Sequence, residues 1–255
     1  MQSGLAVEPI KGARKFHGKQ SRFGHMPEVP FRWLFLGPGS SGKTLTLQNL
    51  LLNHYRNVFH YIAIWSPTAH LDSGWKPIFE YMEKEMGQNL EDPQHPSIFE
   101  DFKGEDLDRI VKDQFTIIKK LKERKGGSGE LPNILLIADD VADQPEAVRR
   151  SNFVGAFVKY RHAQTSTVIL THKWKLLHPA IRINATAVCC FRLRDQDELE
   201  TFIKGISAHL GYKTTKEVYK SCIDDGPYSF LYVDLLANPP KFYCRFEKRV
   251  LVDGE

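Results

Sequence analysis

Short apolar runs alternate with amphipathic stretches along most of the chain. The apolar runs are rich in β-branched and aromatic residues and are bounded by Gly, Pro or Asp, which is typical of buried strands. Five such runs are 31–36, 58–65, 134–138, 167–171 and 187–193. Strands of this kind, separated by helices, predict an α/β fold with a mostly parallel central sheet and helices on both faces.

Helical spacing of apolar residues appears between these runs. The predicted helices begin after Thr44 and cover 106–125, 153–160 and 195–210, whereas 70–105 predicts a mixture of helices and loops. Two late strands, 228–235 and 242–246, follow, with a hairpin across Ala237-Asn238-Pro239-Pro240. We therefore expect a basic N-terminal arm at 1–28 and a single domain at 29–250 with late C-terminal strands.

Composition and charge limit the class of protein. The 255 residues are 42% hydrophobic and 26% charged, as in soluble globular proteins. No apolar run reaches 18 residues, so no membrane span is expected, and the N-terminus does not resemble a signal peptide. Cys189 and Cys190 lie in an apolar run and are interpreted as buried free thiols, which favours a reducing compartment.

A glycine-rich motif follows the first strand. It has the G-x-x-x-x-G-K-T spacing, in which backbone N–H groups cradle phosphates at the start of a helix. Its residues are Gly37, Pro38, Gly39, Ser40, Ser41, Gly42, Lys43 and Thr44, and Leu45 completes the expected nucleotide-binding set. Lys43 is expected to reach the β- and γ-phosphates of ATP, and Thr44 to bind Mg²⁺. The motif predicts a P-loop NTPase of RecA/ASCE-like type, with Walker A at 37–44.

Two acidic residues end the strand at 134–138. Because a charge at the end of a buried strand is unfavourable without a role, Asp139 is interpreted as the Walker B ligand of Mg²⁺, with the motif at 134–140. Asp140 then lies where it can orient or activate the attacking water. The alternative is that the pair, with Asp143, caps the next helix.

The strand at 167–171 leads into His172, so the sensor strand is taken as 167–172. A polar side chain beside the Walker B strand can contact the γ-phosphate or the attacking water. His172 is therefore the predicted sensor, and the alternative is a structural histidine.

Four segments together resemble a known family. They are GPGSSGKT, ILLIADD, VKYRHAQTSTVILTH and LLHPAIRINATAVCCF, and the late run SFLYVDLLANPPKFYCRF also fits. The sequence resembles the genome-packaging ATPases of poxviruses, other nucleocytoplasmic large DNA viruses, virophages and Maverick/Polinton elements, within the FtsK–HerA superfamily. The resemblance covers roughly residues 30–247.

The resemblance implies a homo-oligomeric ring of five or six subunits that hydrolyses ATP and pumps double-stranded DNA into a preformed capsid. It also implies capsid vertex proteins as partners and a location at the site of virion assembly in the host cell. Arg161 and Arg182 lie in the family-like tract and are the candidates for an arginine that completes a neighbour's site. The family commonly has Gln where this sequence has His172, which leaves the mode of action of the sensor open.

Contacts with DNA are expected to involve phosphates rather than bases. The candidates are Lys173 and Lys175 around Trp174, together with two basic groups that alternatively form solvated surfaces. These groups are Lys11, Arg14, Lys15, Lys19 and Arg22, and Lys119, Lys120, Lys122, Arg124 and Lys125. Trp174 itself is interpreted as a core or interface aromatic residue.

Two other functions are compatible with the P-loop. One is a small P-loop kinase, for which 66–105 would supply a mobile lid. The other is an ATP-dependent DNA-binding or capsid-assembly protein with low turnover. The tract after Walker B argues against the kinase, and the pair Asp139-Asp140 argues for hydrolysis.

Overall fold

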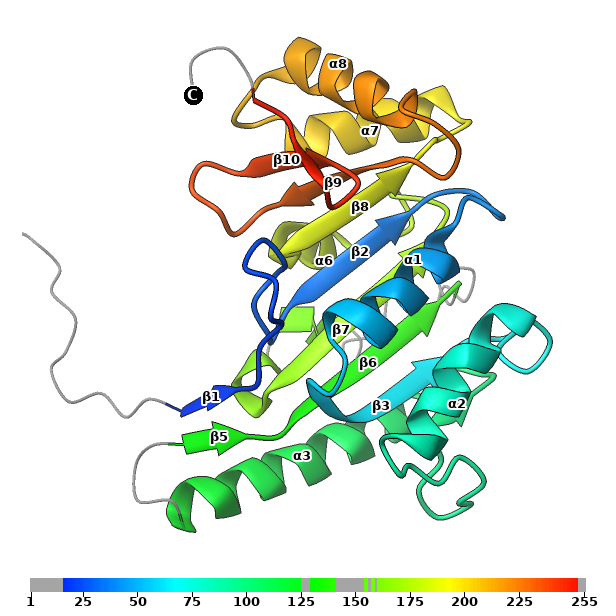
Figure 1. The fold of residues 1–255 in the computed structure, drawn as a ribbon, viewed down its shortest axis with the longest axis vertical. Coiled ribbons are helices and arrows are strands. Elements are labelled where there is room, and N and C mark those ends of the chain that lie inside the picture. Colours follow the sequence, from blue (N-terminus) through cyan, green and yellow to red (C-terminus); the bar gives the residue numbers. More distant parts are fainter. Residues whose placement is uncertain (1–15, 125–128, 141–153, 156, 159, 252–255) are drawn as a thin grey trace, which may run out of the picture.

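A nine-stranded sheet forms the centre of the computed structural model (Figure 1). The structure describes residues 16–124, 129–140, 154–155, 157–158 and 160–251. Along the sheet the described strands run in the order β11-β10-β9-β8-β2-β7-β6-β3-β4. Their bounds are β2 Arg32–Leu36, β3 Phe59–Trp65, β4 Ile98–Phe99, β6 Asn133–Asp139, β7 Thr165–Thr171, β8 Ala187–Phe191, β9 Phe230–Asp234, β10 Lys241–Cys244 and β11 Lys248–Arg249.

The sheet is parallel from β8 to β4 and antiparallel from β8 to β11. The strand β7 lies between β2 and β6, with Leu36 opposite Thr171 and Asp139 opposite Leu170. The carboxyl ends of these three strands therefore meet at one edge of the sheet. In open parallel sheets, ligands bind at this edge.

Both faces of the sheet are buried, which explains the continuous apolar runs. Alternate residues of one strand enter different cores: Leu34 and Leu36 pack on one side, and Trp33 and Phe35 on the other. The cluster on the second side is strongly aromatic, with Phe31, Trp33 and Tyr55 in edge-to-face contacts.

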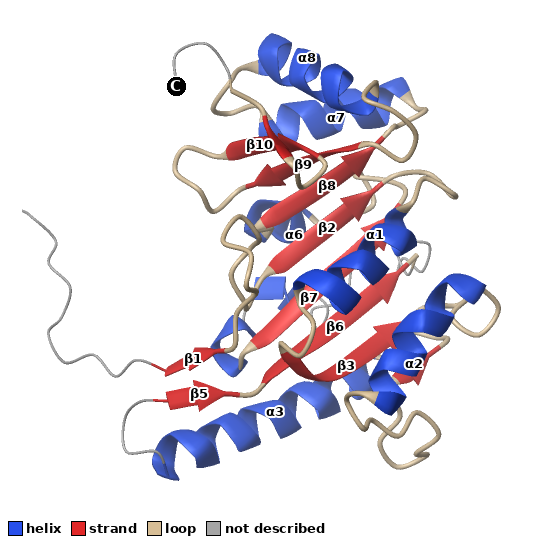
Figure 2. Cartoon of the chain, in the orientation of Figure 1, coloured by secondary structure: helices blue, strands red, loops and turns tan. Residues whose placement is uncertain are grey.

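Helices cover the two faces unequally (Figures 1 and 2). On one side lie α1 (Lys43–Asn49), which continues as a π-helical turn (Leu50–His54), and α2 (Lys76–Lys84). The other side carries α3 (Gly104–Arg124), α6 (Pro179–Asn184), α7 (Gln196–Ile206) and α8 (Tyr212–Ile223). Short 3-10 turns occur at Ser73–Trp75 and Tyr160–Ala163. Among the described residues, no helix combines the length and apolar character needed to cross a bilayer.

Most predicted elements agree with the structure, and the differences lie at their ends. The strand expected at 187–193 ends at Phe191, and the helix expected at 195–210 ends at Ile206. The helix expected at 153–160 is only partly described; residues 154–155 and 157–158 are helical. The late hairpin is confirmed by β9 and β10, which pair antiparallel. The helices α6 and α8 were not predicted.

Residues before the first predicted strand contact the domain from residue 16 onward. The strand β1 (Phe16–Gly18) pairs in parallel with β5 (Gly129–Leu131). Gln20 bonds both the N–H and the C=O of Val29, and the hydroxyl of Tyr55 donates to the Pro27 carbonyl at 2.8 Å. Lys19 and Arg22 belong to this packed segment, whereas Lys11, Arg14 and Lys15 lie outside the described residues.

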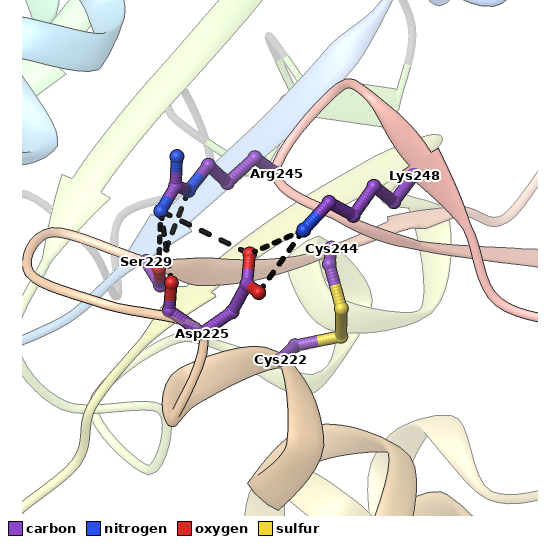
Figure 3. Close-up of a disulfide and its surroundings, with 6 residues drawn as sticks. All are labelled: Cys222, Asp225, Ser229, Cys244, Arg245 and Lys248. Carbon is purple, nitrogen blue, oxygen red and sulfur yellow. Dashed lines mark hydrogen bonds and ion pairs between the residues drawn. A yellow bond between two sulfur atoms is a disulfide. The ribbon is translucent and has the colours of Figure 1, made fainter.

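A disulfide joins Cys222, at the end of α8, to Cys244, at the end of β10 (Figure 3). The sequence did not predict this pair. Cys189 and Cys190 are buried and free, as expected. The free thiols of Cys189 and Cys190 favoured a reducing compartment. The Cys222–Cys244 disulfide does not support that inference, because disulfides persist mainly in oxidising surroundings.

Loss of this disulfide is expected to lower the free energy of unfolding by about 3 kcal/mol, because the cross-link closes a loop between residues 22 positions apart. Chemical denaturation of the oxidised protein, the reduced protein and the double variant Cys222→Ser/Cys244→Ser measures the change. Reductant should leave the stability of the double variant unchanged. Equal stability of all three samples would contradict the prediction.

Candidate nucleotide-binding site

The glycine-rich loop connects β2 to α1 at the carboxyl edge of the sheet. The Gly37 N–H donates to the Thr171 carbonyl at 3.0 Å, which fixes the start of the loop to the end of β7. A Cβ at Gly37 would lie 2.7 Å from Ser41 Oγ and 2.8 Å from Phe191 Cβ, so only glycine fits. Gly42 has φ of 100° and precedes the helix, a conformation that strongly favours glycine.

The side chain of Lys43 folds back over the loop. Its Nζ donates to the carbonyls of Gly37 at 2.8 Å and Pro38 at 3.1 Å, and the residue is only 7% exposed. Burial lowers the pKa of Lys43, and the carboxylates of Asp140 and Asp139 oppose that decrease. Neutral carbonyls are weaker partners for an ammonium group than phosphate oxygens. The lysine is therefore positioned to transfer from the loop to a phosphate.

Asp139 ends β6 and is 6% exposed. Its Oδ2 accepts a hydrogen bond from Ser66 Oγ, just beyond the end of β3, at 3.1 Å. Burial, and then repulsion from Asp140, raise the pKa of Asp139 to about 6, although Ser66 and Lys43 act in the opposite direction. A buried carboxylate next to a second carboxylate is expected to be strongly stabilised by a bound cation.

Asp140 and His172 meet at the same edge. The Asp140 N–H donates to the Leu170 carbonyl at 3.1 Å, and Asp140 has φ of 48°. This left-handed conformation turns the residue at the end of the strand, and its side chain is 49% exposed. Asp140 Oδ1 lies 3.4 Å from Nδ1 of His172. The structure thus brings together two residues that are 32 positions apart in the sequence.

The residues present fit a metal–triphosphate complex. Thr44 is the second residue of α1, Asp139 offers a buried carboxylate, and Lys43 is held by neutral carbonyls. Ser41 Oγ is buried and has no hydrogen-bond partner among the described residues. A group of this kind gains stability when a ligand supplies its partner.

Cavities open on two sides of the loop. One, of about 340 Å³, is lined by Pro38, His172, Lys173 and Lys175 among others. A second, of about 410 Å³, is lined by Pro38–Ser41 and by residues of the C-terminal part, including Tyr228. Arg194 lines both cavities. The sequence analysis missed Arg194, although its place just beyond an apolar strand, like that of His172, was the available signal.

The two candidate arginines lie away from this loop. Arg161 is exposed in the turn before β7. The pKa of Arg32, at the amino end of β2, is lowered first by burial and then by the nearby charge of Arg161. Arg161 therefore lies at the edge of the sheet opposite the P-loop. Arg182, in α6, is half-buried, with its guanidinium 5.9 Å from the ring centroid of Trp174.

The segment 66–105 packs closely on the domain. Trp75, Ile78 and Met82 are fully buried, and the side-chain amide of Gln48 in α1 donates to the Gly74 carbonyl. These contacts argue against a mobile kinase lid. Trp174 is 2% exposed and packs edge-to-face on Phe202, so it is a core aromatic.

Together, the sheet order and this loop define a P-loop ATPase in which β7 lies between β2, which leads into the glycine-rich loop, and β6, which ends at Asp139. The sequence also matches the family described as Poxvirus A32 protein over residues 19–216. This match spans well over half of the 255 residues, and the chain belongs to that family. No curated protein matches the chain.

Solved structures share the fold at low sequence identity. The genome packaging NTPase B204 of Sulfolobus turreted icosahedral virus 2, in complex with AMP, is 16% identical with a TM-score of 0.53, covering 87% of this chain and 98% of that one. The DNA-packaging ATPase B204 of Sulfolobus turreted icosahedral virus is 18% identical with a TM-score of 0.54, covering 84% and 97%. EssC of Geobacillus thermodenitrificans (ATPases 2 and 3) is 14% identical with a TM-score of 0.54, covering 80% of this chain and 38% of that one.

The raised pKa of Asp139 has a measurable consequence for the nucleotide-free protein. Because the folded state holds this proton up to about pH 6 and the unfolded state releases it near 3.8, Asp139 destabilises the fold as pH rises between these values. The cost above pH 6 is about 3 kcal/mol. We expect Asp139→Asn to become progressively more stable than the wild type from pH 4 to pH 7.

Thermal unfolding of both proteins across this pH range measures the difference. Asp197→Asn is the matched control, because its carboxylate is 83% exposed and does not contribute to the raised pKa of Asp139. Parallel stability curves for wild type and Asp139→Asn would show that the buried carboxyl does not titrate as stated.

Proposed function

We propose that this chain is the ATP-hydrolysing motor that moves double-stranded viral DNA into a preformed capsid. The observation that carries the proposal is the convergence of Lys43, Asp139, Asp140 and His172 at one edge of the sheet, in a chain of the poxvirus A32 family. Phosphoryl transfer to water requires a phosphate-binding lysine, a metal-binding carboxylate and a second acid that orients the water.

Binding of ATP begins with the loop. Lys43 exchanges the carbonyls of Gly37 and Pro38 for the β- and γ-phosphates, and the loop N–H groups from Gly39 to Leu45 donate to phosphate oxygens. Nucleotide binding is also supported by the B204 structures, which contain AMP, AMPPCP or ATP-gammaS. Thr44, with its hydroxyl, and Asp139, with its buried carboxylate, are the residues that would hold Mg²⁺. When bound, this ion neutralises charge that develops on the transferring phosphoryl group.

Asp140 is the residue we assign to the attacking water. Its carboxylate is half-exposed and lies at the end of the Walker B strand, so water can reach it. His172, with Nδ1 3.4 Å from Asp140, sits where a γ-phosphate contact and an Asp140 contact can exchange. We assign it as the sensor that distinguishes ATP from ADP.

The subunits form a homo-oligomeric ring of five or six copies in this proposal. Arg161 is the better of the two candidates for the arginine that completes a neighbour's site, because it is exposed at the sheet edge far from its own P-loop. Arg182 is half-buried over Trp174 and would have to leave that ring first. Added positive charge there would stabilise the transition state of phosphoryl transfer.

Duplex DNA would pass through the ring and contact phosphate-binding residues. Lys173 and Lys175 are exposed beside the sensor His172, so they link the DNA surface to the nucleotide site. Capsid vertex proteins are the proposed docking partners, and the proposed location is the site of virion assembly in the host cell.

The rate of ATP hydrolysis with and without duplex DNA tests the motor. We expect Mg²⁺-dependent hydrolysis that duplex DNA of any sequence stimulates and that rising salt weakens, because the contacts are to phosphates. The double variant Lys173→Ala/Lys175→Ala should lose the stimulation and keep the basal rate. Stimulation by a small phosphate acceptor, with indifference to DNA, would favour the kinase alternative and reject the motor.

A further inference from the structure

A cavity of about 590 Å³ adjoins the P-loop on the side of α1. Leu45, Thr46 and Asn49 of the helix form one wall, and residues 227–228 and 245–247 of the C-terminal part form the opposite wall. Its volume lies within the range of small-molecule sites. Of the residues named here, only Leu45 has a role assigned above, through its backbone N–H.

The cavity is continuous with the phosphate-binding loop. A Cβ placed on Gly42 would lie 3.1 Å from Cδ1 of Tyr228, so the tyrosine ring packs directly on the loop. Leu45 comes immediately after Lys43 and Thr44, which hold the β- and γ-phosphates and the metal. The α-phosphate end of a bound triphosphate therefore lies toward Leu45. The group attached to that phosphate is directed into the cavity.

Two exposed apolar side chains border this space. Tyr228 is 63% exposed and Leu45 is 58% exposed, so both side chains are accessible to a ligand in the cavity. Tyr228 also has φ of 57°, a conformation that costs free energy for a residue other than glycine. An exposed aromatic ring kept in a strained turn beside a phosphate site is typical of a group that contacts a ligand.

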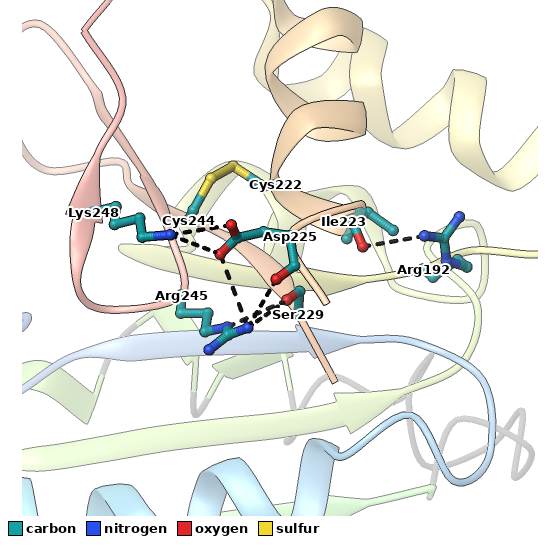
Figure 4. Close-up of polar contacts among 8 residues, drawn as sticks. All are labelled: Arg192, Cys222, Ile223, Asp225, Ser229, Cys244, Arg245 and Lys248. Atoms are coloured by element: carbon teal, nitrogen blue, oxygen red, sulfur yellow. Dashed lines mark hydrogen bonds and ion pairs between the residues drawn. A yellow bond between two sulfur atoms is a disulfide. The ribbon is translucent and has the colours of Figure 1, made fainter. Parts of the chain in front are cut away.

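The wall that carries Tyr228 is held in place by several cross-links (Figure 4). Asp225 accepts from Lys248 Nζ at 3.1 Å and 3.2 Å, and its backbone carbonyl accepts from Arg245 at 3.2 Å. Arg245 also donates to Ser229 Oγ at 3.0 Å. The Cys222–Cys244 disulfide joins the chain just before both segments (Figures 3 and 4). A wall fixed in this way does not have to become ordered when a ligand binds.

We propose that this cavity is the nucleoside subsite of the bound nucleotide, in which the base stacks on Tyr228 and packs against Leu45. The proposal rests on the P-loop function proposed above and adds the residues that distinguish a nucleotide from bare polyphosphate. Stacking on an aromatic face uses the π surface common to all bases. Tyr228 is therefore a determinant of affinity for nucleotides.

Affinities for Mg²⁺·ATP and for Mg²⁺·tripolyphosphate test the subsite, because only ATP has a base. Tyr228→Ala is expected to weaken ATP about tenfold or more and to leave tripolyphosphate within about twofold, given the size of base–aromatic stacking. Tyr228→Phe is the matched control, which keeps the ring and should retain ATP affinity. Leu45→Ala should weaken ATP, but not tripolyphosphate, by a smaller factor.

The outcomes separate this proposal from the motor function. Unchanged ATP affinity in Tyr228→Ala, or equal weakening of both ligands, would overturn the subsite while leaving the motor intact. A wild-type protein that binds neither ligand would overturn the P-loop assignment and, with it, both proposals. Circular dichroism of each variant checks the fold, which is expected to survive because both side chains are exposed.

Discussion

Lys43→Ala is expected to reduce the rate of ATP hydrolysis about a thousandfold, the scale of loss when a preorganised charge partner of the transition state is removed. The Lys43 side chain is buried, and its Nζ donates to the carbonyls of Gly37 and Pro38. No other lysine or arginine lies within the motif 37–44 to replace it. The loss should appear in both the affinity for ATP and the turnover number.

Steady-state hydrolysis and direct nucleotide binding measure this effect. Lys84→Ala is a suitable control, because Lys84 is exposed and forms an ion pair with Glu80 across one turn of α2. The thermal stability of Lys43→Ala should stay close to that of the wild type, since removal of a buried ammonium also removes its desolvation cost. Retention of full hydrolysis would place the catalytic site elsewhere in the chain.

Asp140→Asn is expected to lower the rate of ATP hydrolysis about a thousandfold, as for Lys43→Ala, while leaving the affinity for ATP unchanged. The change keeps the shape of the side chain and removes the carboxylate that orients or activates water. Asparagine also tolerates the left-handed backbone at this position, where φ is 48°. A variant of this kind should therefore fold normally and accumulate bound ATP.

Single-turnover hydrolysis and nucleotide affinity, measured together, distinguish the two acids. Asp139→Asn should instead weaken the Mg²⁺ dependence of binding, because its carboxylate is the proposed metal ligand. If hydrolysis and DNA packaging both persist in Asp140→Asn, the assignment of the water-activating acid is wrong. His172→Gln, which keeps a polar side chain able to donate and accept hydrogen bonds, should keep hydrolysis within severalfold of the wild-type rate.

The sequence predicted the parts of the site whose spacing along the chain is fixed. The loop 37–44 and the pair Asp139-Asp140 each end a buried strand, so local pattern alone located them. The parallel sheet then required their carboxyl ends to share an edge. The same reasoning predicted that His172 lies at this edge, and the structure places its Nδ1 3.4 Å from Asp140 Oδ1.

Features that depend on contacts distant in sequence were not predictable. The Cys222–Cys244 pair requires the end of α8 to lie 4.8 Å, Cα to Cα, from the end of β10, and no spacing rule indicates this. Arg194 and Tyr228 contact the loop region only because β8 and β9 extend the sheet beside β2. The helix α8 is amphipathic but rich in Lys and Thr, which weakened its pattern.

The position of β7 has a consequence for how subunits in a ring would act in turn. This strand ends at Thr171, next to the proposed sensor His172, and begins at Thr165, four residues after Arg161. Its seven residues span about 23 Å. A fully paired strand transmits displacement with little loss, because it is bonded to β2 and β6 on both sides. Suppose that Arg161 of one subunit enters the site of its neighbour. Loss of the γ-phosphate at the P-loop of the first subunit would then displace its own Arg161 within the neighbour's site. The strand would then couple ATP hydrolysis in one subunit to ATP hydrolysis in the next, so that the subunits act in order.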